Sequence, residues 1–358
     1  MILSYNFSLF EKNKKMIKPK KLKRGDKVAT ISLSWGGAGD IPKRYAEGKK
    51  QLENIFGLKV VETTNALKPS EWIYENPQAR ALDLMEALED KSIKAIISNI
   101  GGEDSIRTLP FIDLELIRSN PKIFLGFSDS TVTHFCFYKA GVTSFYGTST
   151  LVGFAENGGM HQYQVSDIKR TLFSSKKIDE IKPNLNGWTS ERLEWKDDKN
   201  QFIKRKLEKS KGWRFLQGTG KVKGVLLGGC LEVMEFMKDT DFWVKPADWK
   251  EKIMFIETSE AKMTPVNFKW IMRNYAASGI LKNIKGLIMA RPYDDLYWKD
   301  YDAILLQVIH DEEGLIDLPI ITGMDFGHTC PTFTIPIGVK AEIDSDKQVF
   351  SILESGVV

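Results

Sequence analysis

Short apolar segments alternate with longer, more polar segments over the first 150 residues of the chain. The apolar segments have the length and composition of buried strands and occupy residues 27–32, 59–63, 94–98 and 123–125. Residues 42–56 and a segment that opens at Pro77 carry helical signals, and Gly57 is placed to end the first of these helices. Strands that alternate with helices predict a parallel sheet with helices on both faces.

The same alternation returns in the second half of the chain. Predicted strands occupy residues 221–227, 252–256, 285–290 and 319–324, and predicted helices occupy residues 230–237, 265–278 and 301–313. We interpret Gly228 and Gly229 as a turn, and we expect short strands between residues 334 and 353. The pattern thus predicts an α/β protein. Its N-terminal domain (residues 16–156) has a mostly parallel sheet flanked by helices, and a second α/β domain (residues 219–358) has short strands.

Between these two predicted domains, residues 157–218 show no clear period. We interpret this segment as a linker with an excursion over the surface, and it contains Trp188, Trp195 and Trp213. A segment so rich in tryptophan is not typical of disordered chain. The tryptophans either contact a ligand or pack the linker onto the domains, and the sequence favours neither interpretation.

Composition sets limits on the class of protein. A length of 358 residues allows two domains, and no apolar run reaches the about 20 residues of a membrane span. The net charge is +4, but eight lysines and arginines lie between residues 12 and 24, and without them it is −4. Because no aromatic or glycine-rich pattern accompanies this basic run, we expect residues 1–15 to be a solvated, disordered extension rather than a nucleic-acid contact. No secretory signal is evident, which favours the cytoplasm.

Cysteines and histidines give no sign of a metal centre. The three cysteines are scattered without a C-x-x-C motif, and no two of the four histidines share metal-ligand spacing. We therefore expect a reducing compartment, no metal and no cofactor.

One stretch, residues 121–140, has the layout of a nucleophile elbow. A short apolar strand is followed by Gly126, Phe127 and Ser128, and then by a segment of helical period. Such a turn lifts the serine hydroxyl out of the sheet and points the first N–H groups of the helix at the group that it attacks. The usual G-x-S-x-G pattern is incomplete here, because Ser130 takes the last position. Helix capping by Ser128, Asp129 or Ser130 is the alternative interpretation.

A serine nucleophile needs a base and an orienting acid. By elimination His328 is the best candidate base, because it lies in a glycine-flanked loop directly after an apolar strand. Glu257 is the candidate acid at the end of another apolar strand, with Glu260 as its rival and a cap or a salt bridge to Lys262 as the alternative role.

Gly101 and Gly102 follow the predicted strand at 94–98 and would allow close approach of a substrate to the backbone. With the N–H of Asp129 they could form an oxyanion hole. A phosphate-binding loop is the alternative, although the sequence G-G-E-D-S fits neither G-x-G-x-x-G nor a P-loop.

Taken together, these segments resemble the LD-carboxypeptidase family of serine peptidases, and most closely its branch of microcin C immunity proteins. The matching segments cover the chain from about residue 16 to its end and are SLSWGG, NIGGEDS, PKIFLGFSDST, LLGGCLE, IMFIETSE, GLIMARP and GMDFGHTCPTFTIPIG. The resemblance implies a Ser-Glu-His triad of Ser128, Glu257 and His328, and an oxyanion hole formed by the N–H groups of Gly102 and Asp129. It also implies an active site between two α/β domains, and a homodimer. Cys230 is a departure, since the family often has asparagine there.

The resemblance implies hydrolysis of a C-terminal amide bond. The substrate would be a small peptidyl or aminoacyl nucleotide antibiotic of the microcin C type, hydrolysed for self-immunity, or alternatively a muropeptide in peptidoglycan recycling. Trp188 and Arg291 are candidate substrate contacts, Arg291 for a terminal carboxylate, with a structural salt bridge as its alternative role. A non-catalytic ligand-binding protein on the same scaffold and a nucleotide-dependent enzyme are the competing classes.

Overall fold

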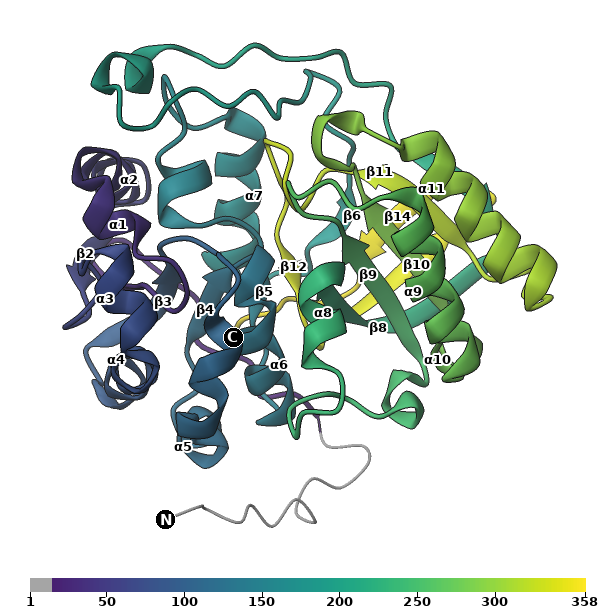
Figure 1. Ribbon diagram of the computed structural model, residues 1–358, viewed down its shortest axis with the longest axis horizontal. Coiled ribbons are helices and arrows are strands. Elements are labelled where there is room, and N and C mark those ends of the chain that lie inside the picture. Colours follow the sequence, from purple (N-terminus) through teal and green to yellow (C-terminus); the bar gives the residue numbers. More distant parts are fainter. Residues whose placement is uncertain (1–14) are drawn as a thin grey trace.

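A computed structural model describes residues 15–358, and the basic extension expected at residues 1–15 lies almost wholly outside them. The chain forms two sheets, each covered by helices (Figure 1). The first sheet has the order β12-β5-β4-β3-β1-β2, with strands β1 (Lys27–Ile31), β2 (Lys59–Glu62), β3 (Ile93–Ser98), β4 (Ile123–Gly126), β5 (Phe145–Tyr146) and β12 (Ile335–Pro336). Its pairs are parallel except that of β12 with β5, which confirms the predicted parallel N-terminal sheet.

Seven helices accompany the first sheet in the described part of the chain. They are α1 (Gly37–Asp40), α2 (Pro42–Phe56), α3 (Ser70–Glu75), α4 (Pro77–Glu89), α5 (Leu114–Ser119), α6 (Thr131–Lys139) and α7 (Gln162–Leu172). Helix α2 ends as predicted at Gly57, whose φ of 69° is left-handed and therefore suits glycine. Apolar faces of α4 and α6 pack on the sheet, so the ends of β3 and β4 are held in a rigid core.

The second sheet has eight strands in the order β6-β14-β13-β8-β9-β10-β11-β7. The strands are β6 (Asp179–Ile181), β7 (Arg214–Gln217), β8 (Lys221–Cys230), β9 (Lys252–Glu257), β10 (Gly286–Ala290), β11 (Ile320–Met324), β13 (Lys340–Asp344) and β14 (Val349–Ile352). The central strands β8 to β11 are parallel, and the strands outside them are antiparallel. The accompanying helices are α8 (Leu231–Met237), α9 (Pro265–Ala277), α10 (Ile280–Asn283) and α11 (Trp298–Leu305), the last continued by π-helical turns at Leu306–Glu312.

The predicted turn at Gly228 and Gly229 is wrong, because both residues lie inside β8. The glycines instead allow neighbouring groups to approach closely. A Cβ atom on Gly228 would lie 1.8 Å from the carbonyl oxygen of Phe255, and one on Gly229 would lie 2.4 Å from Cγ2 of Thr131. This contact joins the second sheet to the start of α6, just after the predicted elbow.

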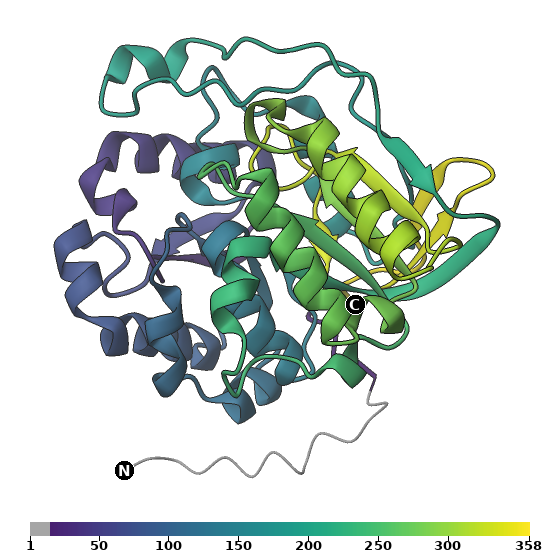
Figure 2. The same ribbon diagram turned by 45° about the vertical axis from the view of Figure 1, so that its right-hand side comes forward.

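The segment 157–218 contains more regular structure than its sequence pattern suggested. Helix α7 buries Val165, Ile168 and Leu172, while β6 and β7 each join an edge of the second sheet. Between β6 and β7 the chain arches over both halves of the molecule, as the teal-green segment at the top of Figures 1 and 2 shows. The excursion thus brings its own side chains over the boundary between the two sheets.

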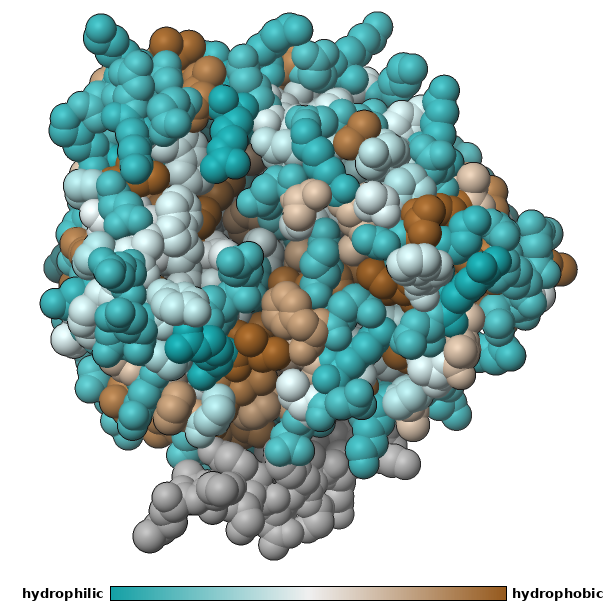
Figure 3. Space-filling model, in the orientation of Figure 1, coloured by the Kyte–Doolittle hydropathy of each residue, from teal (hydrophilic) through white to brown (hydrophobic). Residues whose placement is uncertain are grey.

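Hydrophilic side chains cover most of the face seen in Figure 3. Within residues 15–358 we find no helix that combines the length and the apolar character needed to cross a membrane.

Candidate active site

The turn after β4 has the strained geometry of a nucleophile elbow. Ser128 has a φ of 60°, a left-handed value that costs energy for a residue with a side chain. Its N–H donates to the hydroxyl of Tyr146 over 2.9 Å, and its carbonyl accepts from the hydroxyl of Thr131 over 2.7 Å. These two bonds hold the turn in this left-handed conformation.

The alternative of simple helix capping is not what the structure shows. Neither the short 3₁₀ turn at Ser128–Ser130 nor α6 receives a side-chain cap. The Ser130 hydroxyl donates to Ser98, and the Asp129 carboxylate accepts from the backbone N–H groups of Asp104 and Ser105. The Ser128 side chain is therefore left for another partner.

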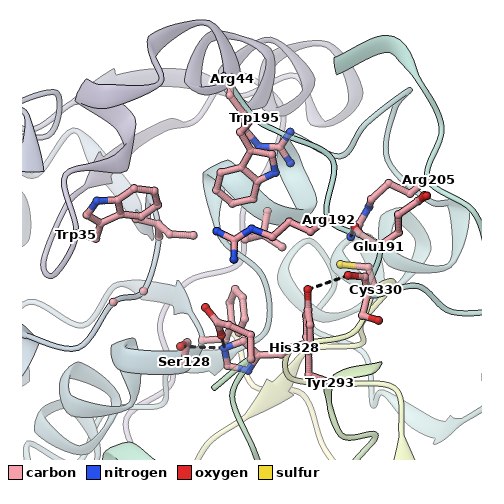
Figure 4. Close-up of a pocket in the computed structure, with 17 residues that line it drawn as sticks. Trp35, Arg44, Ser128, Glu191, Arg192, Trp195, Arg205, Tyr293, His328 and Cys330 are labelled. Carbon is pink, nitrogen blue, oxygen red and sulfur yellow. Dashed lines mark hydrogen bonds and ion pairs between the residues drawn. The ribbon is translucent and has the colours of Figure 1, made fainter. Parts of the chain in front are cut away.

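That partner is His328, on the loop after β11. Its Nε2 lies 3.0 Å from the Ser128 hydroxyl (Figure 4). Its Nδ1 lies 2.5 Å from Oε2 of Glu257 at the end of β9. Glu257 is almost fully buried, and Gly327 makes room for it, since a Cβ atom there would lie 2.9 Å from that of Glu257. The fold thus brings a hydroxyl, an imidazole and a carboxylate from three distant segments into one hydrogen-bonded row.

Tyr146, on β5, is a participant that the sequence analysis missed. Its hydroxyl accepts from the N–H of Ser128 and donates to Oε1 of Glu257 over 2.5 Å. Burial, together with the negative charge of Glu257, raises the pKa of Tyr146 well above its usual value, so the phenol stays a donor. One side chain therefore fixes both ends of the row, although nothing in the sequence around Phe145 and Tyr146 marks it.

The glycine loop after β3 packs directly against the elbow. A Cβ atom on Gly101 would lie 2.9 Å from that of Ser128 and 3.3 Å from the backbone nitrogen of Asp129. Gly102 has a φ of 143°, and a Cβ atom on it would lie 2.3 Å from the hydroxyl of Ser34. Because only glycine fits here, the loop backbone can approach the Ser128 hydroxyl as closely as an oxyanion hole requires.

Glu260 adds a second carboxylate to the site. Its Oε2 lies 2.9 Å from Nε2 of His328, the nitrogen that also faces Ser128. Burial alone would lower the pKa of His328, but Glu257 and Glu260 together raise it well above its usual value. The same contact with His328 lowers the pKa of Glu260 to about 2. Glu260, considered as a rival to Glu257, thus contacts the opposite nitrogen of the ring.

The row opens into a pocket between the two halves of the molecule (Figure 4). Side chains from both sheets and from the excursion line this pocket, among them Trp35, Arg44, Phe127, Arg192, Trp195, Arg205, Tyr293 and Cys330. Arg44 donates to three oxygen acceptors and stacks on Trp195, while Arg205 forms a two-pronged contact with Glu156. Arg192 is exposed and extends between Trp195 and His328 into the open space.

The two predicted substrate contacts, Trp188 and Arg291, do not line this pocket. Both are buried, and the Arg291 guanidinium lies 4.9 Å from the centre of the Trp188 ring. Arg291 also forms a salt bridge of 3.1 Å with Asp325. In this structure both side chains therefore lie outside the pocket lining, and Arg291 has the paired anion that a buried cation needs. The alternative role of Arg291 as a structural salt bridge is the one observed.

Other candidate groups are engaged elsewhere. His134 is buried on α6, where its ring contacts the Ser144 hydroxyl and the carbonyl of Gly126, and burial lowers its pKa to about 4. Lys262, the alternative partner for Glu257, pairs instead with Asp294. In the part of the chain that the structure describes, no three histidine, cysteine or carboxylate side chains converge as metal ligands would.

Comparison with known proteins assigns the fold to a family. The model of the LD-carboxypeptidase N-terminal domain matches residues 28–147, and that of the LD-carboxypeptidase C-terminal domain matches residues 223–343. The chain therefore belongs to the LD-carboxypeptidase family, as its motifs predicted, and it is a serine peptidase of that family. The predicted two-domain α/β fold is likewise confirmed.

Individual relatives span the whole molecule. The chain is 26% identical to the microcin C7 self-immunity protein MccF of Escherichia coli, over 92% of this chain and 94% of the relative. It is also 26% identical to a probable murein peptide carboxypeptidase of Bacillus subtilis, over 95% of both chains.

Solved structures agree with this assignment. An MccF-like protein from Streptococcus pneumoniae, solved in complex with AMP, is 31% identical and superposes with a TM-score of 0.84 over 92% of this chain and 98% of its own. A structure of MccF in complex with aspartyl sulfamoyl adenosine is 26% identical, with a TM-score of 0.80 over 96% of this chain and all of its own.

Proposed function

We propose that Ser128, His328 and Glu257 are the catalytic triad of this peptidase, and that they hydrolyse an amide bond by acyl transfer. The row of hydrogen bonds from the Ser128 hydroxyl through His328 to Glu257, in the wall of a pocket, is the observation that carries this proposal. His328 takes the proton of Ser128 as the hydroxyl attacks the carbonyl carbon, and Glu257 stabilises the imidazolium. His328 then gives that proton to the leaving nitrogen, and water releases the acyl group.

The N–H groups of Gly102 and Asp129 are the proposed oxyanion hole. The close packing of Gly101 against Ser128 and the backbone nitrogen of Asp129 supports this role, because it brings loop and elbow backbones to the same side of the hydroxyl. The Asp129 carboxylate, which accepts from the N–H groups of Asp104 and Ser105, ties the loop to the elbow. Such preorganised donors contribute on the order of 3 kcal/mol each to transition-state stabilisation.

The proposed substrate is a peptidyl or aminoacyl nucleotide of the microcin C type, cleaved at the amide bond to the nucleotide-like part. Two relatives of this fold were solved with AMP and with aspartyl sulfamoyl adenosine, which supports a nucleotide-sized ligand. The pocket offers Trp35 and Trp195 as flat aromatic surfaces and Arg192 as an exposed cation. Arg192 takes over the role of anion contact that the sequence analysis had given to Arg291.

A muropeptide is the second candidate substrate. The relative from Bacillus subtilis described as a probable murein peptide carboxypeptidase favours it, since it matches this chain equally well.

Substitution of Ser128 by alanine tests the proposed triad. We expect S128A to fold normally, as judged by circular dichroism, and to lose both hydrolysis and labelling by a fluorophosphonate probe. Wild-type enzyme offered an aminoacyl sulfamoyl adenosine and a tetrapeptide ending in D-alanine separates the two substrate classes by product analysis. Full hydrolysis by S128A would refute the triad. Tight binding without hydrolysis or labelling in the wild type would favour the non-catalytic alternative.

Two further properties follow from the family resemblance and belong to this proposal: a homodimer and a cytoplasmic location. Light scattering of the purified protein would test the first, and fractionation of cells that produce the full chain would test the second.

A further inference from the structure

The Nε2 atom of His328 lies within hydrogen-bond distance of two groups and cannot form a full hydrogen bond to both at the same time. Ser128 Oγ lies 3.0 Å from it and Glu260 Oε2 lies 2.9 Å from it. A proton on Nε2 bonds more strongly to a carboxylate than to a neutral hydroxyl. Since Nδ1 donates to Glu257, the ring is then a doubly protonated imidazolium held between two carboxylates. An imidazolium cannot accept the proton of Ser128, so this arrangement is a resting state that must open before the serine can attack.

Charged and titratable groups face the ring from several elements. Glu257 comes from the end of β9, Glu260 from the loop that follows it, and Ser128 from the elbow, whose neighbour Phe127 packs its ring 5.1 Å from that of His328. Glu260 also interacts electrostatically with Arg192 and Tyr293. Among the residues that the structure describes, the ion-pair partners of the imidazole are the two carboxylates, and they are therefore the groups that decide its protonation.

Glu257 and Glu260 are anchored very differently. Glu257 is 1% exposed and accepts from Tyr146 as well as from His328, whereas the Glu260 side chain is 53% exposed. Within residues 15–358, His328 is the one ion-pair partner of Glu260. The nearby Lys262 pairs with Asp294 over 2.6 Å and does not hold Glu260 in place. Glu260 is therefore the carboxylate that a competing cation can draw away from the ring, while Glu257 stays.

We propose that Glu260 selects substrates with a free ammonium group next to the scissile carbonyl, and that pairing with this ammonium removes Glu260 from His328. The Nε2 proton then passes to solvent, and the freed lone pair accepts the proton of Ser128. This inference rests on the proposed function and deepens it by naming a chemical feature of the substrate.

The geometry suits an aminoacyl group. The nitrogen of an aminoacyl group lies about 2.5 Å from its carbonyl carbon. Because Ser128 Oγ and Glu260 Oε2 share one Nε2 neighbour, the two oxygens lie no further apart than the sum of their distances to it. A carbonyl held at Ser128 therefore has its amino group within reach of Glu260. In an aminoacyl nucleotide that nitrogen is a free ammonium, whereas inside a longer peptide it is acylated and uncharged. Glu260 would thus favour the nucleotide class over a muropeptide.

Fluorophosphonate labelling of Ser128 tests the resting state without any ammonium. Labelling rates of the full chain are measured against pH for wild type, E260Q and E194Q. The E194Q variant is a control for the lost charge, because in the wild type the Glu194 carboxylate accepts from the N–H of Lys196. Loss of Glu260 lowers the pKa of His328, so E260Q should label several-fold faster near neutral pH, with its midpoint at lower pH, while E194Q behaves like wild type. An unchanged midpoint and rate in E260Q would overturn the proposal. Failure of the proposed function would look different, because labelling would persist in S128A.

Calorimetry in the S128A background tests the ammonium directly. The ligands are an aminoacyl sulfamoyl adenosine and its Nα-acetyl derivative; acetylation removes the positive charge of that nitrogen and adds an acetyl group, and the S128A/E260Q variant controls for the added bulk. We expect S128A to bind the free amine about tenfold more tightly, as one charge-assisted contact allows, and S128A/E260Q to bind both alike. Equal affinities in S128A, or a preference that survives in S128A/E260Q, would refute the assignment.

Discussion

Replacing Tyr146 by phenylalanine removes one oxygen atom from the centre of the site. The hydroxyl accepts from the Ser128 N–H over 2.9 Å and donates to the Glu257 carboxylate over 2.5 Å. The Glu257 carboxylate is almost fully buried, so it does not find water when the hydroxyl is gone, and the partly buried Ser128 N–H loses its partner. A neutral hydrogen bond and one to a charged group together contribute about 2 to 4 kcal/mol, and we expect Y146F to lower the free energy of unfolding by that amount.

The same substitution should impair catalysis by more than stability alone explains. Without Tyr146 the carboxylate of Glu257 can rotate, and the turn at Ser128, with its φ of 60°, loses the bond that holds its N–H. Displacements of a reacting group by about 1 Å cost up to about 100-fold, so kcat/KM should fall between about 10- and 100-fold. The assays are urea unfolding followed by fluorescence, and hydrolysis of an aminoacyl sulfamoyl adenosine at saturating and limiting concentrations.

Tyr45 provides a matched control. Its buried hydroxyl also has two partners, Thr30 at 2.7 Å and the carboxylate of Glu62 at 2.9 Å, and it does not line the pocket. Y45F should therefore destabilise the protein to a similar extent and leave kcat/KM unchanged. If Y146F and Y45F lose equal stability and both retain wild-type kcat/KM, then Tyr146 does not position the triad and the reasoning is wrong.

Two other perturbations follow from the same structure. G102A places a Cβ atom 2.3 Å from the Ser34 hydroxyl at a φ of 143°, so the proposed oxyanion donor must move and kcat/KM should fall by about 100-fold or more. The control is G25A, which also has a left-handed φ, of 89°, but whose added Cβ atom would meet nothing within 4 Å, and it should leave kcat/KM unchanged. Equal activity of G102A and wild type would contradict this. Burial lowers the pKa of His134 to about 4, so the folded protein holds a neutral ring that the unfolded chain protonates below about pH 6.5. Stability should fall by about 2 kcal/mol from this group between about pH 7.5 and pH 5 in urea unfolding, and H134Q should remove that part of the loss; an identical pH dependence in both proteins would rule it out.

Local signals were sufficient for the elements that carry the site. Apolar runs of strand length, proline at a helix start and glycine after a helix end act within a few residues, which is why α2, α4, α9 and the strands before the elbow could be predicted closely. Helix α7 was missed although Val165, Ile168 and Leu172 have helical spacing, since the polar residues between them hid the pattern. Strands β6 and β7 have no such signal, because they are short and exist through pairing with distant strands.

The residues of the site can likewise be divided into those that the sequence identified and those that only the structure revealed. The sequence alone determined the family, the two α/β units and the residues that we propose as the triad, because glycine turns, strand ends and motif order are local properties of the chain. Tertiary structure decided the rest. It assigned Arg291 to Asp325 rather than to the pocket, inserted Tyr146 between Ser128 and Glu257, and brought Glu260 onto His328. Those outcomes depend on which side chains meet across a domain boundary, and the distance and burial that govern such contacts exist only once the chain has folded.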